Sequence, residues 1–347
     1  MKKQALLVLA FALALPAFAK HRAVTPGDGS RCVFLNAPLA ETVTSVFTTD
    51  DRYVYFAEDF GSLYRVPKNG GEVEEIADLS DWLVLSMTVD GTHIYIGAIP
   101  PTFDDPLPAG AILKIQKPDV IIGALPRPKS DVEVIASDVI APFSIATDGT
   151  YVYWVSVGTI SIDNQTIEPD GKIEGVRNDG VGRVTLASNL SAPIELLLDG
   201  DDIWFSESGD ATGNPAQGLR RVAKAGGPVV HVTDAISAGP IDDAGDSIVT
   251  LGATDSGAGL FRIAKADGAI TPLVLDDAIE GGPRVEDGTV YFIRSGVDSE
   301  DASIMRVPLA GGTPQLIRTS SIGSDLFEVD ACALYISEET FLSKVPR

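Results

Sequence analysis

The chain has 347 residues, of which 49 are acidic and 26 are basic, and its net charge is −23. Nucleic acids and anionic lipids are bound by clustered Lys and Arg, so this charge excludes both as partners. Hydrophobic residues make up 45% of the chain, which is enough to fill a core, so the charge does not indicate disorder.

The first 19 residues have the pattern of a secretory signal peptide. Lys2 and Lys3 form a basic start, Ala5–Leu15 is apolar, and Ala17–Ala19 has the small-x-small pattern of a cleavage site. The apolar run is too short to span a bilayer. We therefore expect residues 1–19 to be removed, the mature protein to be secreted or periplasmic, and no segment to span a membrane.

After an N-terminal extension, residues 20–31, a repeated unit fills residues 32–347. Each repeat begins with an acidic turn, followed by a β-branched and aromatic run. The turn residues are Asp50, Asp90, Asp148, Asp199, Asp243, Glu286 and Asp330, spaced 40 to 58 residues apart. The runs are Tyr53–Phe56, His93–Ile96, Tyr151–Trp154, Asp202–Phe205, Ser247–Val249, Val290–Phe292 and Leu334–Ile336. Such a period, with several short strands per unit, predicts an all-β, single-domain β-propeller of four-stranded antiparallel blades. Seven turns favour seven blades, with six as the alternative.

A second recurring run follows each of these and ends in a glycine turn. Leu63–Gly71 is echoed by Leu219–Gly227, and the paired glycines suit a tight hairpin. The last repeat supplies only three strands, so we expect Val33–Asn36 to complete that blade and close the ring, which leaves no exposed edge.

The chain has two cysteines, Cys32 and Cys332, near its two ends. Cys332 falls in the turn between the first and second strands of the last blade, and Cys32 precedes the closing strand on the same rim. An even pair in an oxidising compartment predicts a disulfide that locks the ring.

Asp148–Trp154 and Arg306–Gly312 resemble the YWTD repeats of low-density lipoprotein receptor propellers, and the chain resembles bacterial secreted propellers related to them. The resemblance covers nearly the whole mature chain. It implies the fold and no particular site, because these residues build blades. YWTD propellers have six blades, whereas seven turns are present here.

The usual catalytic motifs are missing from the sequence: it has no G-x-S-x-G, no H-E-x-x-H, no phosphate-binding G-x-x-x-x-G-K and no C-x-x-C. Carboxylate pairs carry little information, because 49 acidic residues produce such pairs by coincidence. The sequence therefore favours a binding protein over an enzyme without deciding between them.

Long loops between second and third strands all emerge on one face, with the connections between blades. These loops are Ala98–Gly110, Val157–Gly171, Ser206–Gly218 and Arg294–Ala302. Insertions on one face of a repeat protein usually mark its binding face. The candidate ligand-binding residues on this long-loop face are Trp82, Asp104, Asp105, Phe143, Asp163, Glu207, Asp210, Asp255, Asp298, Glu300 and Asp301.

These residues predict an acidic face that binds a protein partner or a small-molecule or glycan ligand. No cofactor is predicted. Ca²⁺ is the alternative, because it prefers clustered carboxylates, although no loop has the ordered spacing of a calcium loop. The main hypothesis is a monomeric, exported binding or scaffold module. The alternative is a hydrolase or lyase with an acidic, metal-dependent site at the central mouth.

Overall fold

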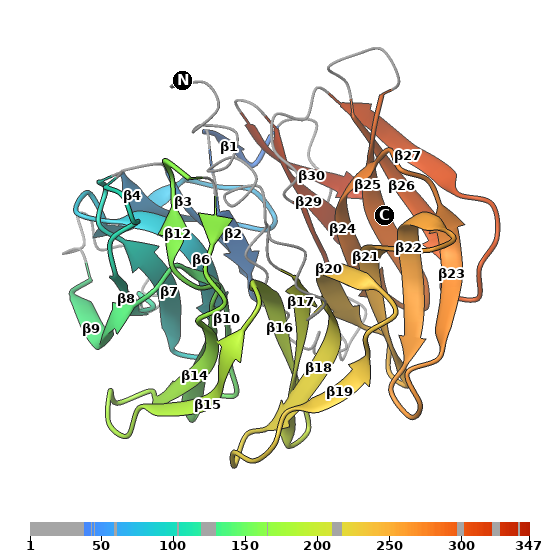
Figure 1. The fold of residues 1–347 in the computed structure, drawn as a ribbon. Helices are drawn as coiled ribbons and strands as arrows, with labels where there is room; N and C mark the ends of the chain where they lie inside the picture. The colour runs from blue at the N-terminus through green and yellow to red at the C-terminus, as the bar shows by residue number, and fades with distance from the viewer. Residues whose placement is uncertain are drawn as a thin grey trace.

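The computed structural model describes residues 38–347, apart from 43, 45, 59–60, 103, 119–129, 165, 210–216, 297–301, 321–326 and 339–340. These residues form no helix, and therefore none that could span a membrane. Their strands build seven four-stranded antiparallel sheets, arranged as the blades of a ring (Figure 1). The predicted seven-bladed propeller is thus confirmed, and the six-bladed alternative is wrong.

The blades follow one another along the chain, each running from an innermost to an outermost strand. Blade 1 consists of β2 (Val46–Thr49), β3 (Tyr53–Ala57), β4 (Ser62–Pro67) and β5 (Glu74–Asp78). Blade 2 consists of β6 (Leu83–Val89), β7 (His93–Ile99), β8 (Gly110–Gln116) and β9 (Val132–Val139). Blade 3 consists of β10 (Pro142–Thr147), β11 (Tyr151–Ser156), β14 (Gly171–Arg177) and β15 (Val184–Leu190).

Blades 4 to 7 repeat this pattern. Blade 4 consists of β16 (Pro193–Asp199), β17 (Asp202–Ser208), β18 (Gln217–Ala223) and β19 (Val230–Thr233). Blade 5 consists of β20 (Ser237–Asp243), β21 (Ser247–Thr254), β22 (Gly257–Ala264) and β23 (Ile270–Leu275). Blade 6 consists of β24 (Ile279–Glu286), β25 (Thr289–Ser295), β26 (Ala302–Pro308) and β27 (Gln315–Ser320). Blade 7 consists of β28 (Phe327–Val329), β29 (Ala333–Glu338), β30 (Phe341–Pro346) and β1 (Ala40–Glu41).

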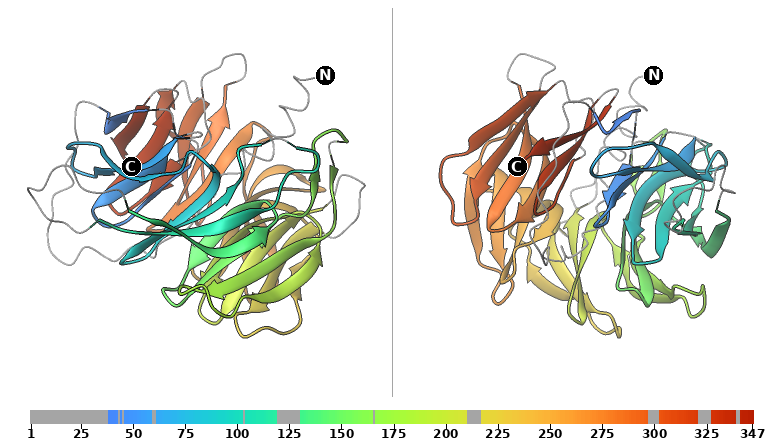
Figure 2. Two further views of the ribbon diagram at one scale, coloured as in Figure 1. Left: turned by 90° about the vertical axis from the view of Figure 1, so that its left-hand side faces the viewer. Right: turned by 180° about the vertical axis from the view of Figure 1, so that it is seen from behind.

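A strand from the N-terminal part of the chain closes the ring, as predicted. β1 pairs antiparallel with β30, with Ala40 opposite Leu342, so the first and last strands belong to one sheet. Figure 2 shows the N-terminal strands in blue beside the C-terminal strands in red. The segment expected to close the ring, Val33–Asn36, lies outside the described residues.

The core consists of apolar clusters between blades, because side chains alternate along each strand and face both neighbouring sheets. On β7, Ile94 and Ile96 belong to the cluster shared with blade 1, whereas Tyr95 belongs to the cluster shared with blade 3. Each of the seven interfaces has such a cluster. The aromatic residues at the Tyr95 position are all buried, and they are Tyr55, Tyr95, Tyr153, Trp204, Tyr291 and Tyr335.

The strand order gives the ring two different faces. On the short-turn face lie the turns between first and second strands, which contain the acidic residues predicted from the repeat. On the opposite, long-loop face lie the loops between second and third strands and the connections between blades. One of these loops contains an extra hairpin, β12 (Ile160–Ser161) with β13 (Thr166–Ile167), which the sequence did not predict.

Candidate functional site

Aspartates build the turns of the short-turn face by accepting hydrogen bonds from the main chain. Asp90 Oδ1 accepts from the N–H groups of Thr92 (2.6 Å) and His93 (2.7 Å), and the Tyr95 hydroxyl donates to Asp90 Oδ2 (2.9 Å). The same pattern recurs at Asp50, Asp148 and Asp330. Asp tolerates such turns because its side chain imitates a main-chain acceptor. The carboxylates are consequently held in fixed positions.

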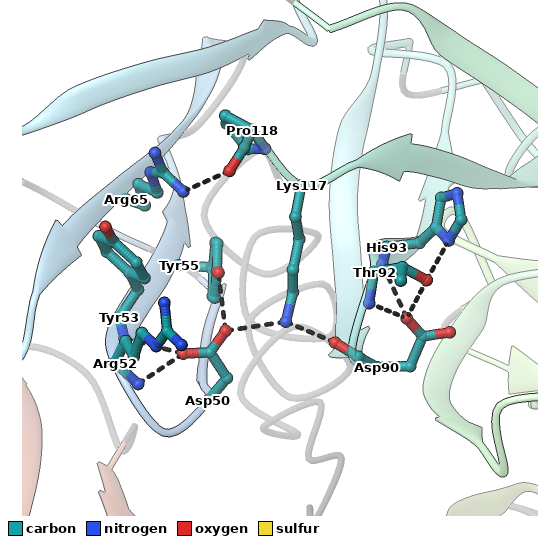
Figure 3. Close-up of polar contacts among 10 residues, drawn as sticks. All are labelled: Asp50, Arg52, Tyr53, Tyr55, Arg65, Asp90, Thr92, His93, Lys117 and Pro118. Carbon is teal, nitrogen blue, oxygen red and sulfur yellow. Dashed lines mark hydrogen bonds and ion pairs between the residues drawn. The ribbon is translucent and has the colours of Figure 1, made fainter. Parts of the chain in front are cut away.

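Cations join three of these four turns, those of Asp50, Asp148 and Asp330, to the next blade. Lys117 of blade 2 reaches back to blade 1, where its Nζ lies 2.8 Å from Asp50 Oδ2, and it also donates to the main-chain oxygen of Asp90 at 2.5 Å (Figure 3). Equivalent inter-blade ion pairs are Lys68–Asp330, Lys224–Asp148, Lys265–Asp199 and Arg347–Asp287. Together these described pairs link neighbouring blades at five of the seven junctions of the short-turn face.

A cavity of about 1080 Å³ lies at the mouth of the central channel on the short-turn face. Turns of blades 2 to 7 line it, including Gly91, Gly149, Gly200, Gly288 and Ala331. Its carboxylates are Asp90, Asp148, Asp199, Asp243, Glu286 and Asp287. Within the described chain, three cations pair with this set: Lys224, Lys265 and Arg347. The carboxylates therefore outnumber the cations at the mouth of the channel.

Two carboxylates of this mouth, Asp90 and Asp148, are held in their ionised form by hydrogen bonds. Burial raises the pKa of Asp90, but hydrogen bonds from Thr92, His93 and Tyr95 outweigh burial, so the pKa lies below its ordinary value. For Asp148, burial is again outweighed, here by main-chain donors and by Lys224, and the pKa is lowered. Fixed negative charge around a concave surface attracts cationic groups.

A second polar group lies deeper in the ring, on the innermost strands of blades 4 to 7. It consists of Glu195, Asp242, Arg284 and Glu328, of which the first three are each 3% exposed. Glu195 Oε2 accepts the Ile241 N–H at 2.7 Å, so this carboxyl bridges blades 4 and 5. Glu195 directly precedes Leu196, which lines the cavity, so this channel group adjoins the mouth.

The Glu195 carboxyl is strongly affected by its burial. Burial raises its pKa to about 8, against the opposing effects of Arg284 and the Ile241 N–H. Arg284 in turn lies 3.7 Å from Glu328, and Asp242 Oδ2 accepts the Val285 N–H at 2.6 Å. A carboxyl that holds its proton near neutral pH can act as a general acid, provided that substrate reaches it.

On the long-loop face, some predicted residues are exposed and others contact neighbouring parts of the protein. Asp104, Asp163 and Asp255 are exposed. Asp105 Oδ1 accepts the Ile162 N–H at 2.8 Å, which ties the blade 2 loop to the β12–β13 hairpin. Trp82 is half-buried and packs against the cluster between blades 1 and 2. These residues come from several blades, and no described contact gathers them into one site.

Two predicted residues of this face are buried. Phe143 is 3% exposed and packs in an apolar cluster with Leu85 and Ile160. Glu207 is 4% exposed, and its carboxylate pairs with Arg220 at 2.9 Å and accepts the Ser191 N–H. In this structure both side chains therefore make contacts within the protein instead of projecting towards solvent.

The remaining predicted residues, Asp210, Asp298, Glu300, Asp301 and Cys32, lie outside the described residues. The Cys32–Cys332 disulfide therefore stays a prediction. Among the residues that the structure does describe, no three His, Cys, Asp or Glu side chains are grouped closely enough to hold a metal ion.

Sequence reasoning missed the short-turn mouth and the channel group. The lysines of the rim had a visible signal, because Lys68, Lys224 and Lys265 follow each echoed third strand by a constant spacing. The channel group had none: Glu195 and Asp242 stand beside apolar residues on strands whose burial on both sides shows only in three dimensions.

No protein-family model and no curated protein matches this chain. Among solved structures, it is similar to Vibrio parahaemolyticus oligogalacturonate lyase (TM-score 0.59, 10% identity, 94% of each chain covered). It is also similar to YCF48 bound to a D1 peptide (TM-score 0.57, 10% identity, 91% of this chain and 98% of that one). A computationally designed protein, Ika8, has a TM-score of 0.54 at 12% identity, with 92% and 100% covered. At these identities the likeness shows the propeller fold alone.

Proposed function

We propose that this protein is an exported, monomeric β-propeller that binds a cationic ligand or a basic protein segment. The observation that carries the proposal is the cavity of about 1080 Å³, ringed by fixed carboxylates at the short-turn mouth. Ligand pockets usually measure roughly 300–1,000 Å³, so the cavity has room for a small ligand or a few residues of a peptide.

The chemistry of the mouth favours recognition over proton transfer. Asp90 and Asp148 have lowered pKa values and stay charged at neutral pH, whereas a general acid or base works best with a pKa near the working pH. Their positions are fixed before a ligand arrives, which reduces the ordering cost of binding. Amines and the side chains of Lys and Arg are the groups that such a rim would attract.

A binding experiment on the purified mature chain tests this proposal. Spermidine and a hexalysine peptide are the probes, titrated calorimetrically in low salt, with a hexaglutamate peptide as the control. We expect both cationic probes to bind, the affinity to fall as salt rises, and Asp148→Asn to weaken both. Failure of both cationic probes to bind at millimolar concentration would overturn the proposal.

The long-loop face is the second candidate for the binding surface. Its exposed carboxylates, Asp104, Asp163 and Asp255, come from loops of three different blades. A triple Asp→Asn variant at these positions should leave spermidine binding unchanged if the mouth is the site. Loss of binding in the triple variant, but not in Asp148→Asn, would assign the ligand to the long-loop face.

The enzymatic alternative rests on Glu195, whose pKa of about 8 would suit a general acid beside the mouth. The fold occurs both in a lyase and in a peptide-bound propeller, so the fold does not separate the two functions. Incubation with oligogalacturonate, with and without added Mn²⁺, should yield no unsaturated product if the protein only binds. Turnover that Glu195→Gln abolishes would establish the enzymatic function instead.

Export is tested separately. Expression of the full chain in a bacterium should give a mature protein whose mass corresponds to a start at Lys20, recovered from periplasm or medium. A cytoplasmic protein that retains residues 1–19 would contradict this part of the proposal.

A further inference from the structure

We propose that the Asp90 carboxylate is the anchor for the cationic group of the ligand. At Asp90 the cationic group of the ligand takes the place that a lysine or arginine of the protein occupies beside the acidic turns of most other blades. This inference rests on the proposed function of the short-turn mouth. It adds the residue that selects the ligand and the class of group selected, a primary ammonium or a guanidinium.

Main-chain hydrogen bonds identify the equivalent residue in six of the blades. In each, the residue just after the third strand donates its backbone N–H to a carbonyl beside the acidic turn of the same blade. Lys117 donates to Thr92 at 2.9 Å, Asn178 to Thr150 at 2.9 Å, and Lys224 to Asp201 at 2.8 Å. We call this place the rim position. Its occupants in blades 1 to 6 are Lys68, Lys117, Asn178, Lys224, Lys265 and Leu309.

At four rim positions a lysine neutralises the turn carboxylate of the preceding blade. Lys117 reaches Asp50 at 2.8 Å, and Lys265 reaches Asp199 at 2.7 Å. Lys68 and Lys224 do the same, and in blade 7 Arg347 pairs with Asp287. The rule, which five of the seven blades follow, is therefore that a blade supplies a cation to the acidic turn of the blade before it.

Blade 3 does not follow this rule, so within the described part of the chain Asp90 of blade 2 receives no cation from it. Its rim residue is Asn178, whose amide donates to the Gly149 carbonyl at 2.7 Å and hydrogen-bonds the Tyr95 hydroxyl. An amide carries no charge, so Asn178 cannot neutralise the Asp90 carboxylate. Blade 6 also departs, with Leu309, but there Asp243 pairs with Lys265 at 2.8 Å.

The donors that do reach the Asp90 carboxylate are neutral. They are the N–H groups of Thr92 and His93 and the hydroxyls of Thr92 and Tyr95. The His93 imidazole adds no charge near pH 7, because burial lowers its pKa. Lys117 binds the main-chain oxygen of Asp90 and the carboxylate of Asp50 instead. Among the described contacts, Asp90 is thus an ionised carboxylate without a cation.

Asp90 lines the cavity, so a ligand in the mouth reaches it. An ammonium or guanidinium beside Asp90 would complete the charge pairing that the other blades complete internally. Charge-assisted hydrogen bonds of this kind are roughly twice as strong as neutral ones. The ligand class that fits is therefore an alkylamine, or a peptide with an accessible Lys or Arg side chain.

A pair of reciprocal substitutions tests the anchor. Asn178→Lys supplies Asp90 with the missing cation from within the chain, and we expect it to weaken spermidine binding about tenfold or more. Lys224→Asn gives Asp148 the environment that Asp90 has now, and should strengthen binding or add a second site. Thr313→Lys is the control, because it adds the same charge at an exposed residue of the short-turn face that does not line the cavity.

The outcomes separate this inference from the proposed function. If Asn178→Lys and Asp90→Asn both bind spermidine like the wild type, while Asp148→Asn does not, the mouth binds cations but Asp90 is not the anchor. If Thr313→Lys weakens binding as much as Asn178→Lys, general charge and not the anchor explains the loss. If the wild type binds no cationic probe, the proposed function itself fails. Thermal melting of each variant confirms that it is folded.

Discussion

Lys68 Nζ lies 2.7 Å from Asp330 Oδ2, although the two residues are 262 positions apart in the chain. Asp330 belongs to the last blade and Lys68 to the first, so this pair fastens the short-turn face where the ring closes. Beside it, Lys344 Nζ donates to the main-chain oxygen of Lys68 at 2.9 Å. Side chains thus reinforce the closure that β1 begins with only two paired residues.

Removing this closing pair should destabilise the fold. In Lys68→Met, Asp330 loses its cation while remaining largely buried, and we expect the free energy of unfolding to fall by about 1–3 kcal/mol. Urea denaturation measures the change. Arg177→Met is the matched control, because the Arg177–Asp179 pair is exposed and should contribute little. Equal losses in the two variants would contradict a special role for the closing pair.

Glu195 should make stability depend on pH between about 4.5 and 8. Its pKa is raised from 4.5 to about 8, so across this window the folded protein holds a proton that the unfolded chain releases. The free energy of unfolding therefore falls as pH rises through the window. Glu195→Gln removes this loss and keeps an acceptor for the Ile241 N–H, so its stability relative to the wild type should rise from pH 5 to pH 8.

Urea midpoints at pH 5, 6.5 and 8 provide the measurement for Glu195. Glu72→Gln, at an exposed position, is the control and should track the wild type at every pH. A constant difference between Glu195→Gln and the wild type would show that Glu195 is ionised throughout this range.

Gly97 is required by the close approach of blades 2 and 3. A Cβ there would lie 2.3 Å from Ser86 Oγ and 2.7 Å from the Pro142 oxygen, two atoms that are hydrogen-bonded to each other at 2.6 Å. We expect Gly97→Ala to cost about 1–3 kcal/mol in urea denaturation, because the interface has no room to relax. Gly91→Ala meets nothing within 4 Å and should be close to neutral. A neutral Gly97→Ala would mean that the two blades separate more readily than their packing indicates.

The predicted Cys32–Cys332 disulfide should stabilise the ring without altering its sheets. Its closed loop spans about 300 residues, for which the loop-entropy model gives on the order of 5 kcal/mol before any strain is subtracted. Reductant should lower the melting temperature and leave the far-ultraviolet circular dichroism at 20 °C unchanged. Cys332→Ser should melt like the reduced wild type and show no response to reductant. Identical melting of oxidised and reduced protein would speak against the bridge.

The repeat made the fold readable from the sequence. Each acidic turn precedes a second strand as expected, because an Asp-built turn and a β-branched run are local features. On the third strands, Arg65 contacts Glu74 at 2.6 Å and Lys114 contacts Glu133 at 2.9 Å, so both cations pair with an acid of the neighbouring outermost strand. Blade 3 has Gly175 at the equivalent position, where a Cβ would lie 2.7 Å from the Tyr153 ring.

The candidate site was less readable, because it depends on contacts between blades. The role of Asn178 becomes visible only when its main-chain hydrogen bond shows that it occupies the rim position, which is a lysine in four other blades. Likewise, nothing local marks Glu195 as buried, since its charge would ordinarily place it at the surface. The long loops predicted a binding site on the long-loop face, whereas the described cavity lies on the short-turn face.

The one-way order of the inter-blade ion pairs bears on how such a ring could change during evolution. Most blades offer an acidic turn to the next blade and a cation to the preceding one. Deletion of one whole repeat would therefore bring together an acid and a cation from the two flanking blades. Duplication of a unit would likewise insert a matching acid and cation. The ion pairs of the rim are therefore compatible with gain or loss of whole repeats. The number of blades then depends on the angle at which neighbouring sheets pack.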